Sequence, residues 1–445
     1  MISNARRIPF YLLIILLLML LSAPVTAEKL TLEQCIEIAK RNNLEIRSAE
    51  HEYNKSRQDV WSAYGRLLPR LDSWMGASRT ITGPTDYLRY DENTQSFVNA
   101  STGVSVSKNY SAGFQLSQTI FDGGANIYGV YGAKADKTGR RYGYEMTVKD
   151  IVYEVKEKYY SLDKAQMLIE VREDAVRRGQ EQLKIAQSRY ELGSASISDV
   201  LKAKVQVAND KLDLVDAENN YKLAMADLNY IMNRDVNLEI EPVQELSIRQ
   251  IDYDYEDAVD AAMDRHPGLL QAEKSLEAAK YNKLASRGSW FPSLSLNASY
   301  SWNEESMEHF VDNFWDKNYR WNVSGSFNFN IFNGFQTKAS YTKSRITYRS
   351  AQDNYYATKN AVALEVKQAF LNLQKASQNL LLTEESEKAA QEDFNLAQEK
   401  YNLGAATILD VIDAQVNYKL AEANRIQSLF DYNLAVSQLE KAMGL

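Results

Sequence analysis

Apolar residues spaced by seven mark two long segments of the chain, one over 148–190 and the next over 200–228. Such a repeat keeps one face of a helix apolar and indicates helices that supercoil around neighbours. The first helix, over about 125–192, would be about 100 Å long at 1.5 Å per residue, which is too long for one compact core. We therefore predict a coiled-coil rod or the wall of a tunnel.

Other segments alternate apolar and polar residues with a period of two, at 110–121, 294–302 and 319–332, and more weakly near 68–82. This alternation predicts strands with one apolar and one polar face. Two structures fit such strands. One is a soluble sheet with a single buried face, and the other is an outer-membrane barrel, whose strands alternate in this way and carry Tyr and Trp near their ends.

The chain also repeats itself. The segment YELGSASISDVLKAK at 190–204 returns 211 residues later as YNLGAATILDVIDAQ at 401–415, and QTIFDGG at 118–124 returns as FNIFNGF at 329–335. Before the strands the offset is 223 residues, which indicates that the first strand–loop–strand segment is 12 residues longer. Each half thus predicts a helix, two strands with a loop, a long helix, a tight turn and a helix.

This repeat sets the expected domain organisation. The first structural repeat covers 28–232 and the second covers 255–445, and a linker over 233–254 separates them where the pattern breaks. Residues 1–27 predict a secretory signal peptide, because two arginines precede a short apolar run and small residues close it. The alternative, a membrane anchor, is disfavoured because the apolar run is short for a span of about 20 residues.

Composition narrows the function. The net charge is −8, and it becomes −10 without the signal segment, which holds Arg6 and Arg7 and no acid. An acidic chain argues against nucleic acid as a partner. The one cysteine, Cys35, cannot form a disulfide within the chain, and no catalytic constellation, zinc pattern or phosphate loop is present. We expect no enzymatic activity, no metal and no cofactor.

An exported acidic chain with alternating strands favours the outer-membrane barrel. Four strands cannot close one, because membrane barrels begin at about eight strands and open edges are not tolerated in lipid. The chain must therefore oligomerise. A dimer would supply eight strands and a trimer twelve.

The turn of each hairpin carries the same helix-ending and helix-starting residues. Gly193 and Gly404 can end the long helices in a left-handed conformation. Ser196 with Asp199, and Thr407 with Asp410, then match the capping box that starts a helix. Both turns are predicted to be tight and exposed.

Taken in order, the segments LTLEQCIEIAKRNN, IFDGG, IFNGF and the two tips resemble the TolC family of outer-membrane efflux channels over nearly the whole mature chain. The resemblance implies a mainly α protein with membrane β-strands. In that fold, a long antiparallel α-helical coiled-coil tunnel adjoins a homotrimeric 12-stranded outer-membrane β-barrel, to which each chain contributes four strands. It also implies a bacterial outer-membrane location with the tunnel in the periplasm, and a periplasmic adaptor and an inner-membrane transporter as partners.

The resemblance also assigns roles at the tips, which it implies form an iris that is closed at rest. It places Asp410, Asp413, Asp199 and Tyr401 at the pore constriction. A basic residue found after the glycine in a well-studied family member is replaced here by Ala406, so the resemblance does not extend to the ion-pair part of the closed-state lock.

Each of these residues also has a structural interpretation. Asp199 and Asp410 could serve only as helix caps. Asp413 has no cap to make, although an exposed acid is usually solvated, and Lys202 stands at its counterpart in the first repeat. Tyr401 ends an apolar stripe and could serve packing.

The adaptor would meet the exposed turns at Leu192, Gly193, Leu403 and Gly404. The sequence therefore predicts a passive trimeric outer-membrane exit duct for small molecules, driven by its partners and in contact with outer-membrane lipid. The alternatives are the outer-membrane component of type I protein secretion and, in a different class, a periplasmic coiled-coil structural protein without a pore.

Overall fold

The computed structural model describes residues 28–243, 246–248, 254–312 and 316–445. The predicted signal segment and part of the predicted linker lie outside these ranges. Two compact units are present, and each is described by itself. The helical unit comprises the described residues up to 51 together with 142–270 and 357–445, and the sheet unit comprises 52–141 and the described part of 271–356.

The main elements occur twice along the chain. In the first half they are α2 (Leu32–Asn42), α3 (Leu44–Gly65), β2 (Arg70–Thr82), β5 (Ser105–Phe121), α4 (Ala125–Glu191) and α5 (Ile197–Ile231). In the second half they are α6 (Tyr255–Arg265), α7 (Pro267–Arg287), β7 (Ser293–Glu304), β8 (Tyr319–Asn328), α9 (Gln336–Asn402) and α10 (Ile408–Ala442). The helices α4 and α9 have 67 residues each, which confirms the long helix predicted from the seven-residue spacing.

The core of the helical unit gathers apolar side chains from several helices around Tyr159 and Leu162 of α4 and Leu228 of α5, all of them fully buried. The Tyr159 hydroxyl donates to the carbonyl of Val243 at 2.7 Å and lies 3.0 Å from that of Leu30. Leu30 ends strand β1 (Glu28–Leu30) and Val243 directly follows strand β6 (Ile240–Pro242), so both carbonyls lie at one end of this short parallel pair. The segment predicted as a plain linker therefore contains a strand.

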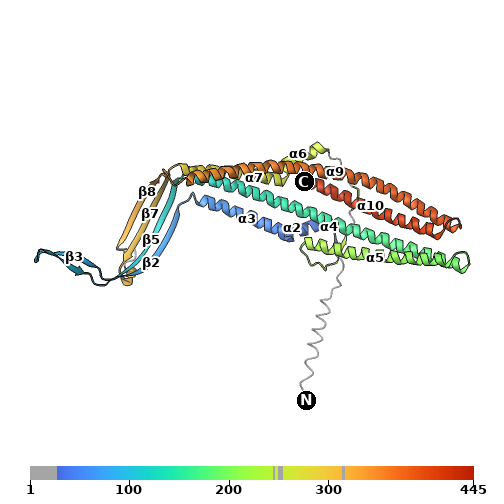
Figure 1. The fold of residues 1–445 in the computed structure, drawn as a ribbon, viewed down its shortest axis with the longest axis horizontal. Coiled ribbons are helices and arrows are strands. Elements are labelled where there is room, and N and C mark those ends of the chain that lie inside the picture. The colour runs from blue at the N-terminus through green and yellow to red at the C-terminus, as the bar shows by residue number, and fades with distance from the viewer. Residues whose placement is uncertain (1–27, 244–245, 249–253, 313–315) are drawn as a thin grey trace, which may run out of the picture. The chain divides into compact units, whose positions relative to one another are not determined.

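The sheet unit contains four antiparallel strands in the order β2-β5-β7-β8, seen side by side in Figure 1. The strands predicted over 110–121, 294–302 and near 68–82 are all present. Strands β2 and β8 each pair on one side only within the described residues. Since unpaired strand edges present free N–H and C=O groups, both edges are available to further strands.

One strand is shorter than predicted and another is longer. The strand predicted over 319–332 ends at Asn328, because its partner β7 begins at Ser293, which pairs with Asn328, and Pro292 precedes it. Strand β5 begins at Ser105, five residues before the predicted start at 110, because β2 continues to Thr82 and pairs with Ser105. The extent of the partner sets the length of each strand.

The alternation of apolar and polar residues is weak in β2 because Trp74, an apolar residue, lies on the polar face of the sheet. Its partner across the ladder is Gly113. A Cβ atom at Gly113 would lie 3.1 Å from the Trp74 ring and 2.7 Å from the carbonyl oxygen of Tyr300. The indole thus covers a glycine, an arrangement that compensates for the missing side chain.

Two small elements in the loops between strands were not predicted. The hairpin β3 (Asp86–Asp91) and β4 (Ser96–Ser101) occupies the first loop, where the sequence indicated extra residues. The second loop instead carries the short helix α8 (Met307–Asp312). Among the described helices, none has an apolar stretch long enough to cross a bilayer.

Candidate pore tip and membrane face

Two tight turns in the helical unit join α4 to α5 and α9 to α10 (Figure 1). Gly193 and Gly404 have φ angles of 75° and 78°, which confirms the predicted left-handed conformation. In the first turn, the N–H of Gly193 donates to Tyr190 and that of Ser194 donates to Arg189. The second turn repeats both bonds. This paired pattern satisfies the last carbonyls of each long helix.

The predicted capping boxes are confirmed at the start of α5 and α10. The Asp199 carboxylate accepts from the Ser196 N–H at 3.0 Å, and the Asp410 carboxylate accepts from the Thr407 N–H at 2.7 Å. The Thr407 hydroxyl donates to Asp410 as well, also at 2.7 Å. The bond from the Thr407 N–H and then that from its hydroxyl hold the pKa of Asp410 below its ordinary value.

Asp413 lies one turn beyond this cap on α10 and is exposed. Its counterpart in the first repeat, Lys202 on α5, is exposed too. The two tips therefore present opposite charges at equivalent places. Asp413 has no part in the cap, so it is free to interact with solvent or with a ligand.

Tyr401 lies inside the tip and not on its surface. Its ring is 5% exposed and packs with Phe394, Ile408 and Tyr418. The Arg189 guanidinium lies 4.2 Å from the ring centroid and donates to the carbonyls of Tyr401 at 2.8 Å and Asn402 at 2.9 Å. A cation is stabilising at the C-terminal end of a helix, so Arg189 of α4 caps α9.

Leu192 and Leu403 are the most exposed large apolar residues of the two turns, at 83% and 85%. Nothing lies within 4 Å of a Cβ atom built on Gly193 or Gly404. Both turns therefore offer an open surface with one apolar side chain each.

A buried polar cluster joins the two hairpins farther along α5 and α10. The Lys419 ammonium donates to Asp210 at 2.8 Å and to Asp213 at 2.9 Å, and Asp210 is fully buried. Gln415 lies beside them and donates to the carbonyl of Ala175 on α4. Burial alone would lower the pKa of Lys419, but the bonds to the two carboxylates outweigh it and raise that pKa.

A second link between the hairpins lies on α4 and α10. The Arg178 guanidinium donates to Glu422 at 3.0 Å and lies 4.9 Å from the ring centroid of Tyr418. Burial and the nearby Glu422 carboxylate raise the pKa of Tyr418 to about 12.

Sequence reasoning missed Arg189 and the cluster at Lys419. The cluster could have been noticed only as a break in the repeat, since Lys419 and Asp210 correspond to Ala208 and Ala421. Arg189 matches Lys400 and gives no such hint. The sequence pointed to Ala406 as a missing basic partner, but the structure brings a basic group to the tip from the other repeat.

The sheet unit carries the second candidate site, an exposed apolar face. Alternate side chains of the strands share this face, and most are more than a third exposed, among them Leu71, Leu296, Tyr319, Trp321, Val323 and Phe327. The other face carries polar side chains, such as Ser295 and Ser326, whose hydroxyl oxygens lie 2.6 Å apart. The predicted separation of faces is confirmed on β7 and β8.

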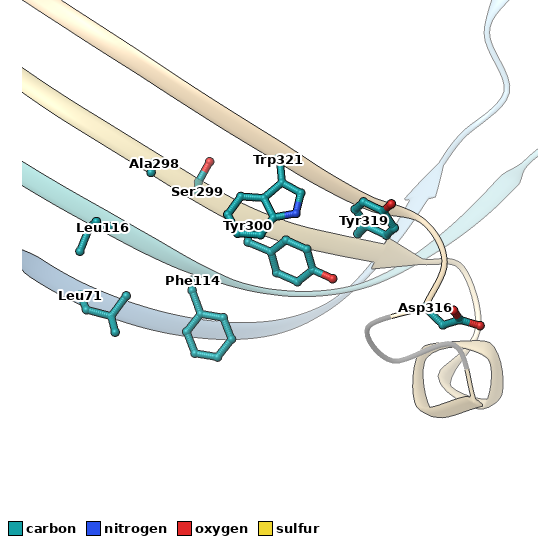
Figure 2. Close-up of a pocket in the computed structure, with 9 residues that line it drawn as sticks. All are labelled: Leu71, Phe114, Leu116, Ala298, Ser299, Tyr300, Asp316, Tyr319 and Trp321. Atoms are coloured by element: carbon teal, nitrogen blue, oxygen red, sulfur yellow. The ribbon is translucent and has the colours of Figure 1, made fainter.

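Aromatic rings gather at one end of the apolar face (Figure 2). Tyr300 lies between Tyr319 and Trp321, with ring centroids 5.9 Å and 4.9 Å away. These rings border an open groove of about 650 Å³ that also contacts Phe114 and Leu71. Trp302 on the same face is buried under Phe310 of α8. Such aromatic residues are typical of the interface between lipid and water.

Two antiparallel helical hairpins, and a sheet with one open apolar and one polar face, are the parts of an outer-membrane channel subunit. The family model described as "Outer membrane efflux protein" matches residues 35–234 and 258–445. The chain belongs to this family, and its place is the bacterial outer membrane. The family consists of efflux channels and is not a family of enzymes.

Individual relatives match over most of their length. Outer membrane protein TolC of Vibrio cholerae is 24% identical over 429 residues, with 95% of this chain and 92% of the relative covered. Outer membrane efflux protein BepC of Brucella suis is 22% identical over 414 residues, with 93% and 85% covered. The crystal structure of the Campylobacter jejuni CmeC outer membrane channel has a TM-score of 0.80 at 18% identity, with 93% and 85% covered, which shows a shared fold.

Proposed function

We propose that three copies of this chain form a passive exit duct in the outer membrane, through which small molecules leave the cell. A periplasmic adaptor and an inner-membrane transporter would supply the cargo and the energy, with the helical hairpins in the periplasm. The observation that carries this proposal is the four-stranded sheet with an exposed apolar face and two open edges.

The open edges support assembly into a closed barrel. Strands β2 and β8 lack a second partner within the described residues of one copy, and lipid does not tolerate unpaired strand edges. Pairing β8 of each copy with β2 of the next would satisfy both edges. Three copies of the four-stranded sheet would then close a barrel of twelve strands, with the apolar face toward lipid and the polar face toward the lumen.

The tips support a constriction that favours cations. Each copy would contribute Asp410 and Asp413, so six carboxylates would surround one axis. Rings of acids attract cations, and the attraction grows with the charge of the ion. Asp199 and Tyr401 would act on this constriction indirectly, the first as a helix cap and the second by packing inside the tip.

Single-channel recording in planar bilayers tests the duct and its constriction together. The purified protein should conduct, and a trivalent cation added on the tip side should block it. Asp413→Ala should weaken the block at least tenfold, and Asp410→Ala/Asp413→Ala should abolish it. As a control, Asp393→Ala removes an exposed acid of α9, away from the proposed constriction, and should leave the block unchanged. A protein that forms trimers without any current would refute the duct.

The turns offer a test of the adaptor. We expect the exposed side chains of Leu192 and Leu403, with the open left-handed turns at Gly193 and Gly404, to dock against adaptor helices. Leu192→Asp/Leu403→Asp should leave the trimer and its current intact and remove dye and drug export from cells. Normal drug export with lost protein secretion would instead favour a type I secretion role.

A further inference from the structure

The apolar face of the sheet continues past the last strand residues onto α4. After an irregularity in the ladder between Thr119 and Phe121, Phe121 pairs with Leu294. Phe121 then borders an open groove of about 330 Å³, whose lining is almost entirely apolar and aromatic. The lining residues are Phe121, Gly123, Gly124, Ile127, Tyr128, Tyr131 and Phe291.

Two glycines build this groove. Gly123 has a φ angle of 68°, and a Cβ atom there would lie 2.5 Å from the carbonyl oxygen of Gly288. A Cβ atom at Gly288 would lie 2.7 Å from the carbonyl oxygen of Asp122. The backbone at the start of α4 therefore touches the backbone at the end of α7. This close crossing lets Phe291 and Ile127 line one groove.

Three basic residues belong to segments that form or adjoin the groove. Arg287 immediately precedes Gly288, and Lys134 lies one turn beyond Tyr131 on α4. The carbonyl of Arg66 accepts a hydrogen bond from Asn126, at the first turn of α4. All three basic residues are exposed. The groove thus has apolar walls and basic residues next to it along the chain, and the ammonium of one of them, Lys134, lies 5.2 Å from the centroid of the Tyr64 ring.

Positive charge prevails in the segments around the groove although the whole chain has a net charge of −8. Asp122 also lies beside the groove, and its carboxylate accepts hydrogen bonds from the N–H groups of Gly124 and Asn126. Residues 280–290 carry Lys280, Lys283 and Arg287 and no acid, and the first 14 residues of α9 also carry only basic charges. At the opposite end of the strands, the loop between β7 and β8 contains Glu305, Glu308 and Asp312.

We propose that this groove binds a glycerophospholipid with an anionic headgroup, in the leaflet that meets the junction of strands and helices. Part of one acyl chain would lie against Phe121, Ile127 and Phe291, and the phosphate would meet Arg66, Lys134 and Arg287. Continuity with the apolar sheet face and complementary charge both select this ligand. The site rests on the proposed placement of the sheet in the membrane.

Native mass spectrometry of the full-length trimer tests the site. The trimer is presented with equal amounts of phosphatidylglycerol and phosphatidylcholine of the same acyl chains, and the retained lipids are counted. The parent should retain the anionic lipid preferentially. Arg66→Glu/Lys134→Glu/Arg287→Glu should reduce this preference at least tenfold, since each basic residue near an anionic surface contributes about fivefold.

Two matched variants separate the parts of the site. Lys359→Glu/Lys375→Glu/Lys388→Glu makes the same charge change on exposed residues of α9 in the helical unit, and it should leave the preference unchanged. Phe291→Ser removes an apolar wall, so it should lower the retention of both lipids while the preference between them persists.

The lipid-retention experiment can fail independently of the single-channel test of the duct. A parent trimer that conducts but retains both lipids equally would overturn the lipid site and leave the duct standing. A triple variant that keeps the parent's preference would overturn it too. Loss of binding to isolated peptidoglycan sacculi with an unchanged lipid preference would assign the basic residues to the cell wall instead. A trimer with the expected preference but no current would retain the lipid site and remove the duct.

Discussion

The two tips of this protein are built from nearly the same sequence, yet they lie in different surroundings. Both turns have a left-handed glycine and a capping box. In the first tip, Tyr190 and Ile197 are 46% and 52% exposed. Their counterparts in the second tip, Tyr401 and Ile408, are 5% and 2% exposed.

The difference arises from the neighbours of the last helix. Helix α10 bonds to α4 through Glu422, to α5 through Lys419 and to α9 through Arg425. It is therefore enclosed by helices of its own chain. Helix α5 instead leaves one apolar face open, with Leu201, Val205, Leu212 and Leu223 all more than half exposed.

Equivalent residues of the two repeats can therefore have similar sequences and local structure and still differ in burial and in the helices that they contact. The second tip is held by contacts within one chain, whereas the open face of α5 remains available to another copy in the proposed trimer. A sequence change at equivalent positions should therefore have unequal effects wherever the side chain meets α10, and equal effects wherever only the backbone turn is involved.

The largest expected effect is at the cluster that has no equivalent in the repeat. Lys419→Met leaves Asp210 buried without its cation, and breaking a buried pair in this way costs about 3–5 kcal/mol. Hydrogen exchange of α10 should report this loss. Lys202→Met, an exposed residue near the first tip, should change little. Asp210→Leu/Lys419→Met should recover most of the stability, because no unpaired charge is then buried. A double variant that is as unstable as Lys419→Met alone would contradict the role of the unpaired charge.

The next effect concerns Arg189 and its counterpart Lys400. Arg189→Ala removes two hydrogen bonds to the end of α9 and the contact with the Tyr401 ring, which together contribute about 1–2 kcal/mol in this partly exposed setting. The amides of 401–405 should exchange faster. Lys400→Ala should leave the first tip nearly unchanged. Equal loosening of both tips would show that the caps are symmetric after all.

The glycines should give equal effects and so provide the control for the comparison. Gly193→Ala and Gly404→Ala each force a left-handed conformation at a site with open space around it, at a cost of about 1–2 kcal/mol. Thermal unfolding of each variant trimer should shift by the same amount. A much larger shift for Gly404→Ala would mean that the second turn has packing constraints in addition to its backbone conformation.

The smallest effect depends on pH. Because the folded state lowers the pKa of Asp410, its cap stabilises α10 above the ordinary carboxyl pKa, and this contribution is lost as pH falls through the lowered value. Exchange protection of the first turn of α10 should therefore decline below about pH 4. Asp410→Asn should show weaker protection at neutral pH and no such decline. A decline that persists in the variant would assign it to another group.

Several features were predictable from the sequence because they depend on residues close together in the chain. The seven-residue spacing from Val148 to Tyr190 predicted α4, and the alternation around Tyr300 predicted β7. Gly193 followed by Ser196 and Asp199 predicted the turn and the cap. In each case the hydrogen bonds and the exposed faces repeat with a fixed local period, so composition and order are sufficient.

Other features depended on which segments meet. The tertiary structure alone decided that Arg189 caps a helix of the other repeat, that Lys419 reaches Asp210, and that β1 pairs with a segment predicted as a linker. It also decided that Trp302 is covered by α8. Burial and pairing across about 200 residues are set by packing between elements, and an identical local pattern cannot distinguish a helix enclosed by its own chain from one with an open face.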